Sequence, residues 1–541
     1  MIRPRRGARS PGPGNNGEVT PDADSTSSAV AYATAEAAAA SWARAWFLNA
    51  SETDFALVDG SASGPAMLVE AYERLHRVAV GAVSARSDGG RTPLALRLKR
   101  MGFDRLIRSL GLRLVTAGRG HRPTFDRVPV AFVPELATPS ALQPMMSVAR
   151  ALGADKYSVR AADPRPYRQW AQLANRRRVA LTVGPGEEIR ILRKARREAR
   201  GVWQTLSKSA PRFELQGGDM TPAVMSALKP MILRSMPWLA VERTALRRSL
   251  SDDPPGVVVV ASDQHRIGRL VVEEAHALGC PVVVLQHGLP QSELGYLPVS
   301  ADRIALWSQA SRRWFEERGT PADRLAVLGN PRFDDLITLD RGVTRRAVDQ
   351  RLGLPGEGPR LLLALSGTLV ELNAQVVEWA VEALARMPDA SLVVKLHPGL
   401  REWRFVGDIV DRNLGSATRR VRVLHRDPLY PLLKWADVTF VHRSSVGLES
   451  LVAGTPVVAA GIEGSITSDL PALDIPQVSS GAALAQLMAE LSGEEAGRRY
   501  FESRRAALED AAGPLDGQTC ERISQYLLEL ARERREKSPG D

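Results

Sequence analysis

Short runs of valine, leucine and isoleucine alternate with longer amphipathic stretches over most of the chain. Near-continuous apolar runs predict strands buried on both faces, as in parallel sheets covered by helices. The clearest runs lie at 128–134, 256–262, 281–285 and 360–365. Between them, stretches such as 139–152 and 267–278 predict helices. This alternation predicts an α/β fold with two Rossmann-like domains that face a cleft.

Breaks in this pattern divide the chain. The segment Gly329–Asp334 interrupts the first series of strands, and a second series opens at Arg360. We expect a disordered or helical N-terminal extension (1–50), an accessory α/β segment (51–120), an N-terminal Rossmann-like acceptor domain (121–340) with a helical basic insert (187–251), a C-terminal Rossmann-like nucleotide-donor domain (341–510), and an amphipathic helix and tail (511–541).

Composition narrows the functional classes. The net charge of +11 and the pI near 10.0 favour an anionic partner, although a genome rich in G and C would produce a similar excess of arginine. Two cysteines exclude a disulfide framework, and no Cys/His spacing indicates a metal site. The basic N-terminus lacks the apolar run of a secretion signal. We therefore expect a cytoplasmic protein without a metal or other cofactor.

The candidate donor site centres on a polar turn between two apolar runs. Arg443, Ser444 and Ser445 follow one run and open a short predicted helix, where free N–H groups favour a phosphate. The alternative is that a serine only caps the helix. Glu449 lies too far along for a capping box, so its carboxylate is a candidate for ribose hydroxyls; an ion pair is an equal alternative.

Two further strand ends belong to the same half of the chain. His397 and Pro398 end an apolar run, because proline cannot continue a strand, and Lys395 lies two residues earlier. Ser366 and Gly367 follow the first strand of this half and offer a second phosphate contact. We predict that these residues bind the donor nucleotide.

The acid–base candidates lie in the first half. Asp263 and His265 follow one buried strand, and His287 follows the next. Histidine suits proton abstraction from a hydroxyl near neutral pH, and an aspartate can do the same or orient the histidine. The alternative for each histidine is a structural hydrogen bond at a strand end.

Four motifs in order resemble those of bacterial surface-polysaccharide glycosyltransferases. They are Gln286-His287-Gly288, Gly329-Asn330-Pro331-Arg332-Phe333-Asp334, Lys395-Leu396-His397-Pro398, and Ser444-Ser445 with Glu449. The relevant groups are the capsule transferases that use CMP-linked Kdo or sialic acid and the teichoic-acid glycerophosphotransferases that use CDP-glycerol. The resemblance implies nucleotide binding by His397, Pro398, Ser444 and Ser445, catalysis by His287, and places for Asn330 and Arg332 in the cleft.

The resemblance implies a glycosyltransferase of the two-domain type called GT-B. It would transfer a sugar or polyol phosphate, without a metal ion, from a nucleotide-activated donor, with a CMP- or CDP-linked one as a candidate. The acceptor would be a hydroxyl of a bacterial surface polysaccharide or its lipid-linked precursor. Two alternatives stay open: a UDP-sugar 2-epimerase-like enzyme, and a catalytically degenerate assembly protein that binds a glycan or nucleotide. Nucleic acid is not an expected partner, because no aromatic residues interleave the basic clusters.

The C-terminal stretch 517–537 predicts an amphipathic helix with Ile523, Leu527 and Leu530 on one stripe. Such a helix can pack back across the two domains. Its basic end, with Arg532, Arg534 and further cations, can instead contact an anionic membrane. The sequence therefore leaves a peripheral position on the inner membrane face as an expectation.

Overall fold

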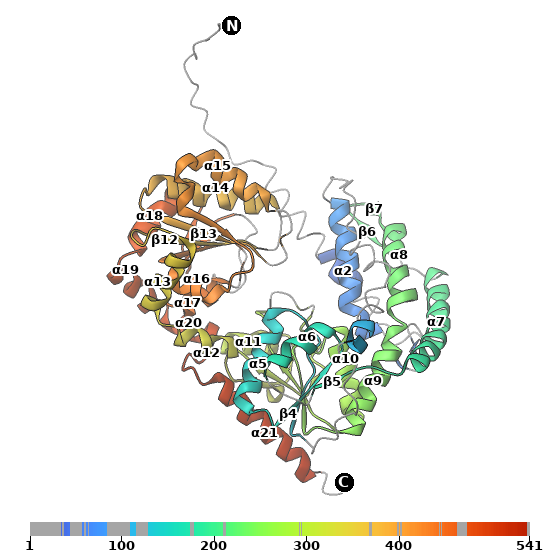
Figure 1. Ribbon diagram of the computed structural model, residues 1–541. Helices are drawn as coiled ribbons and strands as arrows, with labels where there is room; N and C mark the ends of the chain where they lie inside the picture. The colour runs from blue at the N-terminus through green and yellow to red at the C-terminus, as the bar shows by residue number, and fades with distance from the viewer. Residues whose placement is uncertain are drawn as a thin grey trace, which may run out of the picture.

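A computed structural model of the chain forms two α/β domains (Figure 1). It describes residues 34, 37–43, 57–58, 61–62, 64–83, 109–114, 128–173, 178–208, 212–290, 293, 295–366, 370–397, 400, 403–442, 444, 446–462 and 473–537. Each domain has a parallel sheet with helices on both faces, so the predicted fold class is confirmed.

The first sheet has seven parallel strands in the order β11-β10-β9-β8-β3-β4-β5. The strands are β3 (Val130–Phe132), β4 (Tyr157–Ala161), β5 (Arg178–Ala180), β8 (Val257–Val260), β9 (Val282–Leu285), β10 (Arg303–Leu306) and β11 (Leu325–Val327). The chain runs outward from β3 to β5 and then from β8 to β11 in the opposite direction. The order therefore reverses between β3 and β8.

Side chains of β8 alternate between two cores, as a strand period of two requires. Val257 and Val259 face the core beneath α5 (Pro139–Leu152) and α21 (Thr519–Lys537). Val258 and Val260 face the core beneath α10 (Arg266–His276) and the helical insert. Both faces are covered, which explains why the strand reads as an unbroken run of valine.

The helical insert packs on the second face of this sheet together with N-terminal elements (Figure 1). Its members are α7 (Pro185–Lys208), the hairpin β6 (Glu214–Leu215) and β7 (Gly218–Asp219), α8 (Thr221–Pro230), the π-helix η3 (Met231–Ser235) and α9 (Trp238–Asp252). The N-terminal elements are β1 (Leu57–Val58), β2 (Ser61–Ala62) and α2 (Gly64–Val83). Residues 37–43 are helical, and Ala39 and Ala43 are buried in the same core.

The second sheet has six parallel strands in the order β14-β13-β12-β15-β16-β17, which also reverses once, between β12 and β15. The strands are β12 (Arg360–Ala364), β13 (Ser391–Lys395), β14 (Val421–Leu424), β15 (Val438–Val441), β16 (Val457–Ala460) and β17 (Gln477–Val478). Helices α14 (Val370–Arg386), α15 (Arg404–Leu414) and α18 (Gly481–Leu491) cover one face. Helices α13 (Arg341–Leu352), α16 (Leu429–Trp435), α17 (Val446–Val452) and α20 (Arg505–Ala512) cover the other.

Contacts between helices join the domains. Helix α12 (Pro331–Thr338) contacts α5 and α21 of the first domain and α17 of the second. Helix α11 (Gln309–Glu316) meets α20, where Arg313 Nη1 donates to Asp510 Oδ1 at 2.8 Å. Helix α19 (Glu494–Glu502) precedes α20. The break predicted around Gly329–Asp334 thus contains a helix that touches both domains.

The C-terminal helix α21 packs on the first domain, with Ile523 and Leu527 buried against α5 and the sheet. At its basic end, Arg534 donates to the backbone carbonyl oxygens of Gly279, Leu278 and Pro255. The helix therefore packs along the first domain and α12 and does not cross to the second sheet, and Arg534 is occupied within the protein. Within the described residues, no helix is both long and apolar enough to cross a membrane.

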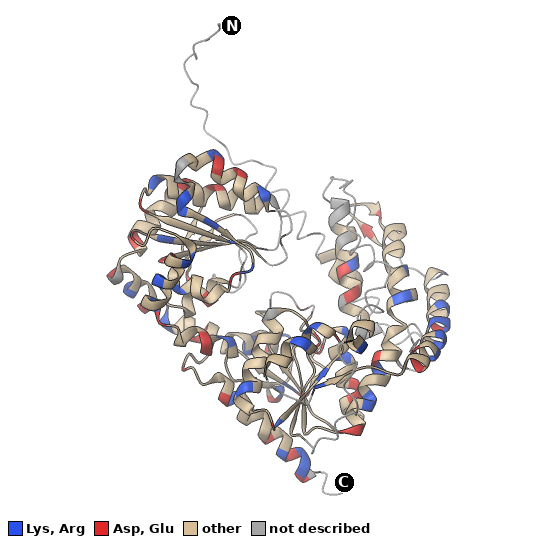
Figure 2. Cartoon of the chain, viewed as in Figure 1, with Lys and Arg blue, Asp and Glu red and all other residues tan. Residues whose placement is uncertain are grey.

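Basic residues of the insert divide into two groups (Figure 2). On α9, Arg243, Arg247 and Arg248 form ion pairs with glutamates of α10 and α7. On α7, the cluster Arg193–Arg197 keeps its arginines and lysine on the exposed side of the helix, and Ala195 is buried. The first group stabilises helix packing, and the second is a solvated face.

Candidate active site at the carboxyl edge of the first sheet

The strand-order reversal between β3 and β8 sets the place of the candidate site. Ligands of open parallel sheets bind outside the carboxyl ends of the strands, at the point where the strand order reverses. The loops after β3, β8 and β9 lie side by side there, because these strands are neighbours in the sheet. They carry Glu135, Asp263, His265 and His287.

Two contacts orient the ring of His287. Its Nδ1 lies 2.9 Å from the carbonyl oxygen of Ala261, and its ring stacks on Tyr296 at 5.3 Å with the planes 4° apart. A carbonyl oxygen only accepts, so Nδ1 carries the proton and Nε2 keeps its lone pair. Removal from water lowers the pKa of His287, with the Ala261 bond and Asp263 acting in the opposite direction. The neutral imidazole is the form that can act as a base at neutral pH.

Asp263 is held by backbone donors instead. Its Oδ2 accepts from the N–H groups of Ser300 at 2.5 Å and Ala301 at 3.0 Å, and Gln264 donates to Oδ1 at 3.2 Å. The side chain is buried. These bonds fix the loop before β10, which makes Asp263 a poorer candidate for proton abstraction than His287.

His265 precedes α10 and bonds within its own loop, the one that follows β8. Its Nδ1 lies 2.9 Å from Ser262 Oγ, and its ring meets that of His287 edge-on at 6.2 Å. Removal from water, and then the charge of His287, lowers its pKa to about 4. His265 therefore stays neutral beside His287 and supports the shape of the loop.

Glu135 is a site residue that sequence reasoning missed. It follows β3, and its Oε1 accepts from the N–H of Ser262 at 2.6 Å, across the reversal of strand order. Burial raises the pKa of Glu135 to about 8. The Ala261–Ser262 peptide group accepts from His287 through its oxygen and donates to Glu135 through its nitrogen, so one peptide plane links both side chains. A carboxyl directly after the first strong strand was the available signal.

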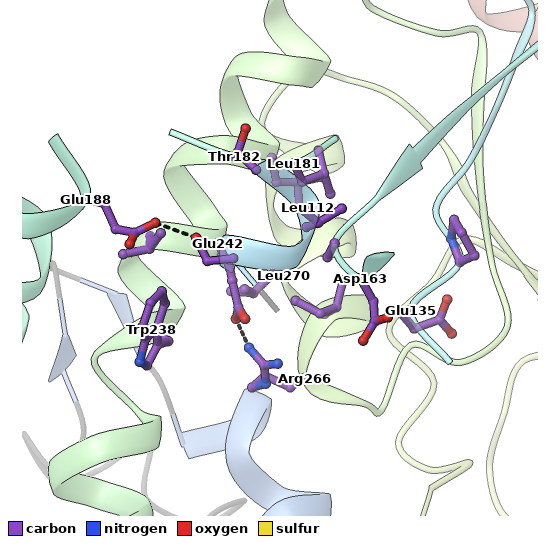
Figure 3. Close-up of a pocket in the computed structure, with 16 residues that line it drawn as sticks. Leu112, Glu135, Asp163, Leu181, Thr182, Glu188, Trp238, Glu242, Arg266 and Leu270 are labelled. Atoms are coloured by element: carbon purple, nitrogen blue, oxygen red, sulfur yellow. Dashed lines mark hydrogen bonds and ion pairs between the residues drawn. The ribbon is translucent and has the colours of Figure 1, made fainter. Parts of the chain in front are cut away.

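A pocket opens beside Glu135, between the sheet and the helical insert (Figure 3). Its volume is about 70 Å³. Residues after β3, β4 and β5 line one side, and α9, α10, α7 and the helix at 109–114 line the other. Four acidic side chains line it: Glu135, Asp163, Glu188 and Glu242.

The donor candidates of the second domain lie at its own reversal of strand order. Ser366 follows β12, and Ser444 follows β15, the adjacent strand. Ser366 is buried, and its carbonyl oxygen accepts from Asn373 at 3.3 Å. Ser444 is half-buried, and its Oγ accepts from the N–H of Val446, the first residue of α17, at 3.3 Å.

Lys395 and His397 lie at the end of the neighbouring strand β13. The Lys395 ammonium donates to the carbonyl oxygens of His425 at 2.9 Å and Leu396 at 3.2 Å, and desolvation lowers its pKa. His397 is exposed at the sheet edge. Partial desolvation, and then the charge of Lys395, lowers the pKa of His397. The structure thus brings Ser366, Ser444, Lys395 and His397 to one edge of one sheet.

Glu449 and Arg332, two candidates for the cleft, form an ion pair with each other. Arg332 Nη2 lies 2.6 Å from Glu449 Oε1, and both side chains are mostly buried. The pair joins α12 to α17, so the ion-pair alternative for Glu449 is the one found. Asn330 caps α12 through Oδ1, which accepts from the N–H of Arg332 at 3.1 Å. Both Asn330 and Arg332 thereby serve the junction between the domains.

Four residues of the predicted donor site lie outside the described residues: Gly367, Pro398, Arg443 and Ser445. Among the described residues, no group of three or more His, Cys, Asp or Glu side chains is arranged to hold a metal ion.

The chain is similar to known proteins in structure but not in sequence. No protein family and no curated protein sequence matches the chain. Among solved structures, UDP-GlcNAc 2-epimerase from Neisseria meningitidis bound to UDP-GlcNAc is similar at 13% identity and a TM-score of 0.49, over 75% of this chain and 99% of that one. A glycosyltransferase from Rickettsia africae is similar at 12% identity and 0.45, over 76% and 99%. HepE from Anabaena in complex with UDP is similar at 13% and 0.43, over 76% and 100%.

Proposed function

We propose that the protein transfers a sugar, or a polyol phosphate, from a nucleotide-activated donor to a hydroxyl of a surface polysaccharide or its lipid-linked precursor. The observation that carries this proposal is the state of His287. Its Nδ1–H is fixed on the Ala261 carbonyl, so a basic Nε2 remains at the carboxyl edge of the first sheet. An oriented, neutral histidine suits removal of a proton from an attacking hydroxyl.

The second domain would hold the donor. Ser366, Ser444, Lys395 and His397 gather at the reversal of its strand order, where phosphates of nucleotides bind in open sheets. Lys395 uses two of its three N–H groups on carbonyl oxygens, which leaves one for a phosphate oxygen. A fixed cation there would balance the charge of the leaving nucleotide without a metal ion. A cytidine-linked donor is the first candidate, on the resemblance in the four motifs.

The test of this function is His287→Gln. With a nucleotide-sugar and an acceptor extract, turnover should fall by about 10²–10⁴-fold, the usual contribution of a positioned base. Nucleotide binding should stay unchanged, because His287 belongs to the other domain. His276→Gln, at an exposed histidine paired with Asp302, is the matched control and should keep its activity. Activity in His287→Gln equal to that of the control would refute the role.

A second function is favoured by one observation. A sugar 2-epimerase needs several acids around the ring, and four acidic side chains line the pocket next to Glu135. Such an enzyme would act without an acceptor. Incubation of UDP-GlcNAc with the protein in D2O would then give the epimer with deuterium at the isomerised carbon. A nucleotide released only when an acceptor is present would instead support transfer.

A further inference from the structure

Helix α7 has one side in the protein and one side in solvent (Figure 2). Buried residues such as Leu192, Ala195 and Ala199 recur every three or four positions, and the helix packs there on α9 and η3. The positions between them are exposed and mostly basic. We call these cations the basic face: Arg190, Arg193, Lys194, Arg196, Arg197 and Arg200.

Ion pairs within the protein use little of this charge. In the part of the chain that the structure describes, no carboxylate lies within ion-pair distance of Arg193, Arg196 or Arg197. Lys194 Nζ lies 3.8 Å from Glu198 Oε1, and the lysine side chain is 65% exposed. Like charges four residues apart, as at Arg193 and Arg197, destabilise a helix. A row of cations that the fold does not need therefore indicates an anionic partner.

Apolar side chains are exposed at the start of the same helix. Ile189 is 51% exposed, and Leu110 and Leu114 of the helix at 109–114 are 48% and 75% exposed. Arg113 Nη2 lies 2.6 Å from Glu188 Oε2, so that helix is held against the first turns of α7. Three of the five large hydrophobic side chains exposed among the described residues thus form one apolar patch, and such patches mark interaction surfaces.

An anionic membrane would use both features. Lipid phosphates attract cations, and the boundary between headgroups and acyl chains takes apolar side chains. A polyanion such as nucleic acid would need only the cations. At 24 residues, α7 is about 36 Å long, so it can lie along a bilayer. We propose that α7 and the helix at 109–114 dock on an anionic membrane, with the basic face on lipid phosphates and the apolar patch in that boundary.

This surface begins at the edge of the first sheet that carries His287. Strand β5 ends at Ala180, and α7 begins at Pro185, directly beyond the carboxyl end of that strand. Because the strands of this sheet are parallel, their carboxyl ends share one edge. Docking would therefore bring the catalytic edge toward a lipid-linked acceptor. That use rests on the proposed function, whereas membrane binding itself does not.

The test is flotation of the full chain with vesicles of phosphatidylcholine, with and without phosphatidylglycerol. Wild type should bind the anionic vesicles at least about tenfold more tightly than the neutral ones, and salt should weaken this binding. Arg193→Gln/Arg196→Gln/Arg197→Gln should bind them at least about tenfold more weakly, because each basic residue near the surface contributes about fivefold. The matched control removes the same charge from exposed arginines of the second domain and should bind as wild type does. Its substitutions are Arg386→Gln, Arg412→Gln and Arg499→Gln.

A second pair of variants separates a membrane from a polyanion. Leu114→Gln/Ile189→Gln should bind anionic vesicles about threefold more weakly or worse, because it buries less apolar surface in the bilayer. Val343→Gln/Trp403→Gln changes two exposed hydrophobic side chains outside the patch and should bind as wild type does. All the substituted side chains are exposed, so the variants should fold, which melting curves check.

Three outcomes would overturn the proposal. They are no flotation with anionic vesicles, an equal loss in the two arginine variants, and equal binding by the two apolar variants, which would assign the basic face to a polyanion. Nucleotide-induced thermal shifts on the same proteins separate this proposal from the transferase function. Vesicle binding without any nucleotide response would sink the transferase and leave the docking surface, and the reverse pattern would sink the docking surface alone.

Discussion

Glu135→Gln changes how stability depends on pH, and the structure gives the magnitude. The ordinary pKa of this carboxyl is 4.5, and burial raises it to about 8 in the folded protein. Between these pH values the Glu135 carboxyl binds a proton in the folded state and loses it in the unfolded state. Its contribution to stability is therefore greatest at low pH and is lost as pH rises. Linkage gives a loss of about 3 kcal/mol between about pH 5 and pH 8. Glutamine keeps an acceptor for the Ser262 N–H and cannot ionise.

The observable is the difference between two melting curves. His265 and His287, whose pKa values are lowered, change stability in the opposite direction, but they do so equally in wild type and variant. The melting temperature of Glu135→Gln minus that of wild type should therefore rise by roughly 6–12 °C from about pH 5 to pH 8, for a domain of this size.

A second variant shows whether the loss of any carboxyl would change the melting curves in the same way. Glu317→Gln removes an exposed carboxyl from the same domain and should run parallel to wild type. Parallel curves for Glu135→Gln and wild type would refute the neutral buried carboxyl beside Ser262.

Two further changes test the packing around the sites. Arg332→Ala leaves Glu449 as a buried unpaired charge and should lower the free energy of unfolding by about 3–5 kcal/mol in chemical denaturation. The control Arg386→Ala breaks the exposed pair with Glu382 and should lower it by about 1 kcal/mol or less. Equal losses in the two variants would contradict the buried junction. Gly268→Ala places a Cβ 1.7 Å from the carbonyl oxygen of Ser262 and should lower the free energy of unfolding by about 1–3 kcal/mol. The control Gly201→Ala has open space around it and should be neutral or stabilising. A tolerated Gly268→Ala would contradict the close approach of α10 to the Ser262 loop.

Local pattern predicted much of the fold. Helix α5 begins at Pro139 and ends before Gly153, the proline and glycine positions that favour a helix start and stop. Runs of valine in β8 and β9 predicted buried parallel strands. Strand β5 was missed, because Arg178–Ala180 is short and half-buried at the sheet edge, so neither an apolar run nor an alternation marks it.

The candidate site could be predicted only in part. Strand ends placed His287 at the sheet edge, because the position depends on local pattern alone. The partners of Asp263 and Glu449 lie 37 and 117 residues away in sequence, at Ser300 and Arg332, and no spacing rule reports such contacts. Glu135 gained its importance from the strand order, which brings Ser262 next to it across 127 residues.

The central claim is that the second domain binds an activated nucleotide. Thermal shifts with CMP, CDP, UDP, GDP and ADP test it most directly, because a ligand that binds the folded state raises stability by about 2.7 kcal/mol at 100 times its Kd. We predict a concentration-dependent shift with one pyrimidine nucleotide that is reduced in Lys395→Met and kept in Lys208→Met, at the exposed end of α7. No shift with any of the five nucleotides would contradict the claim.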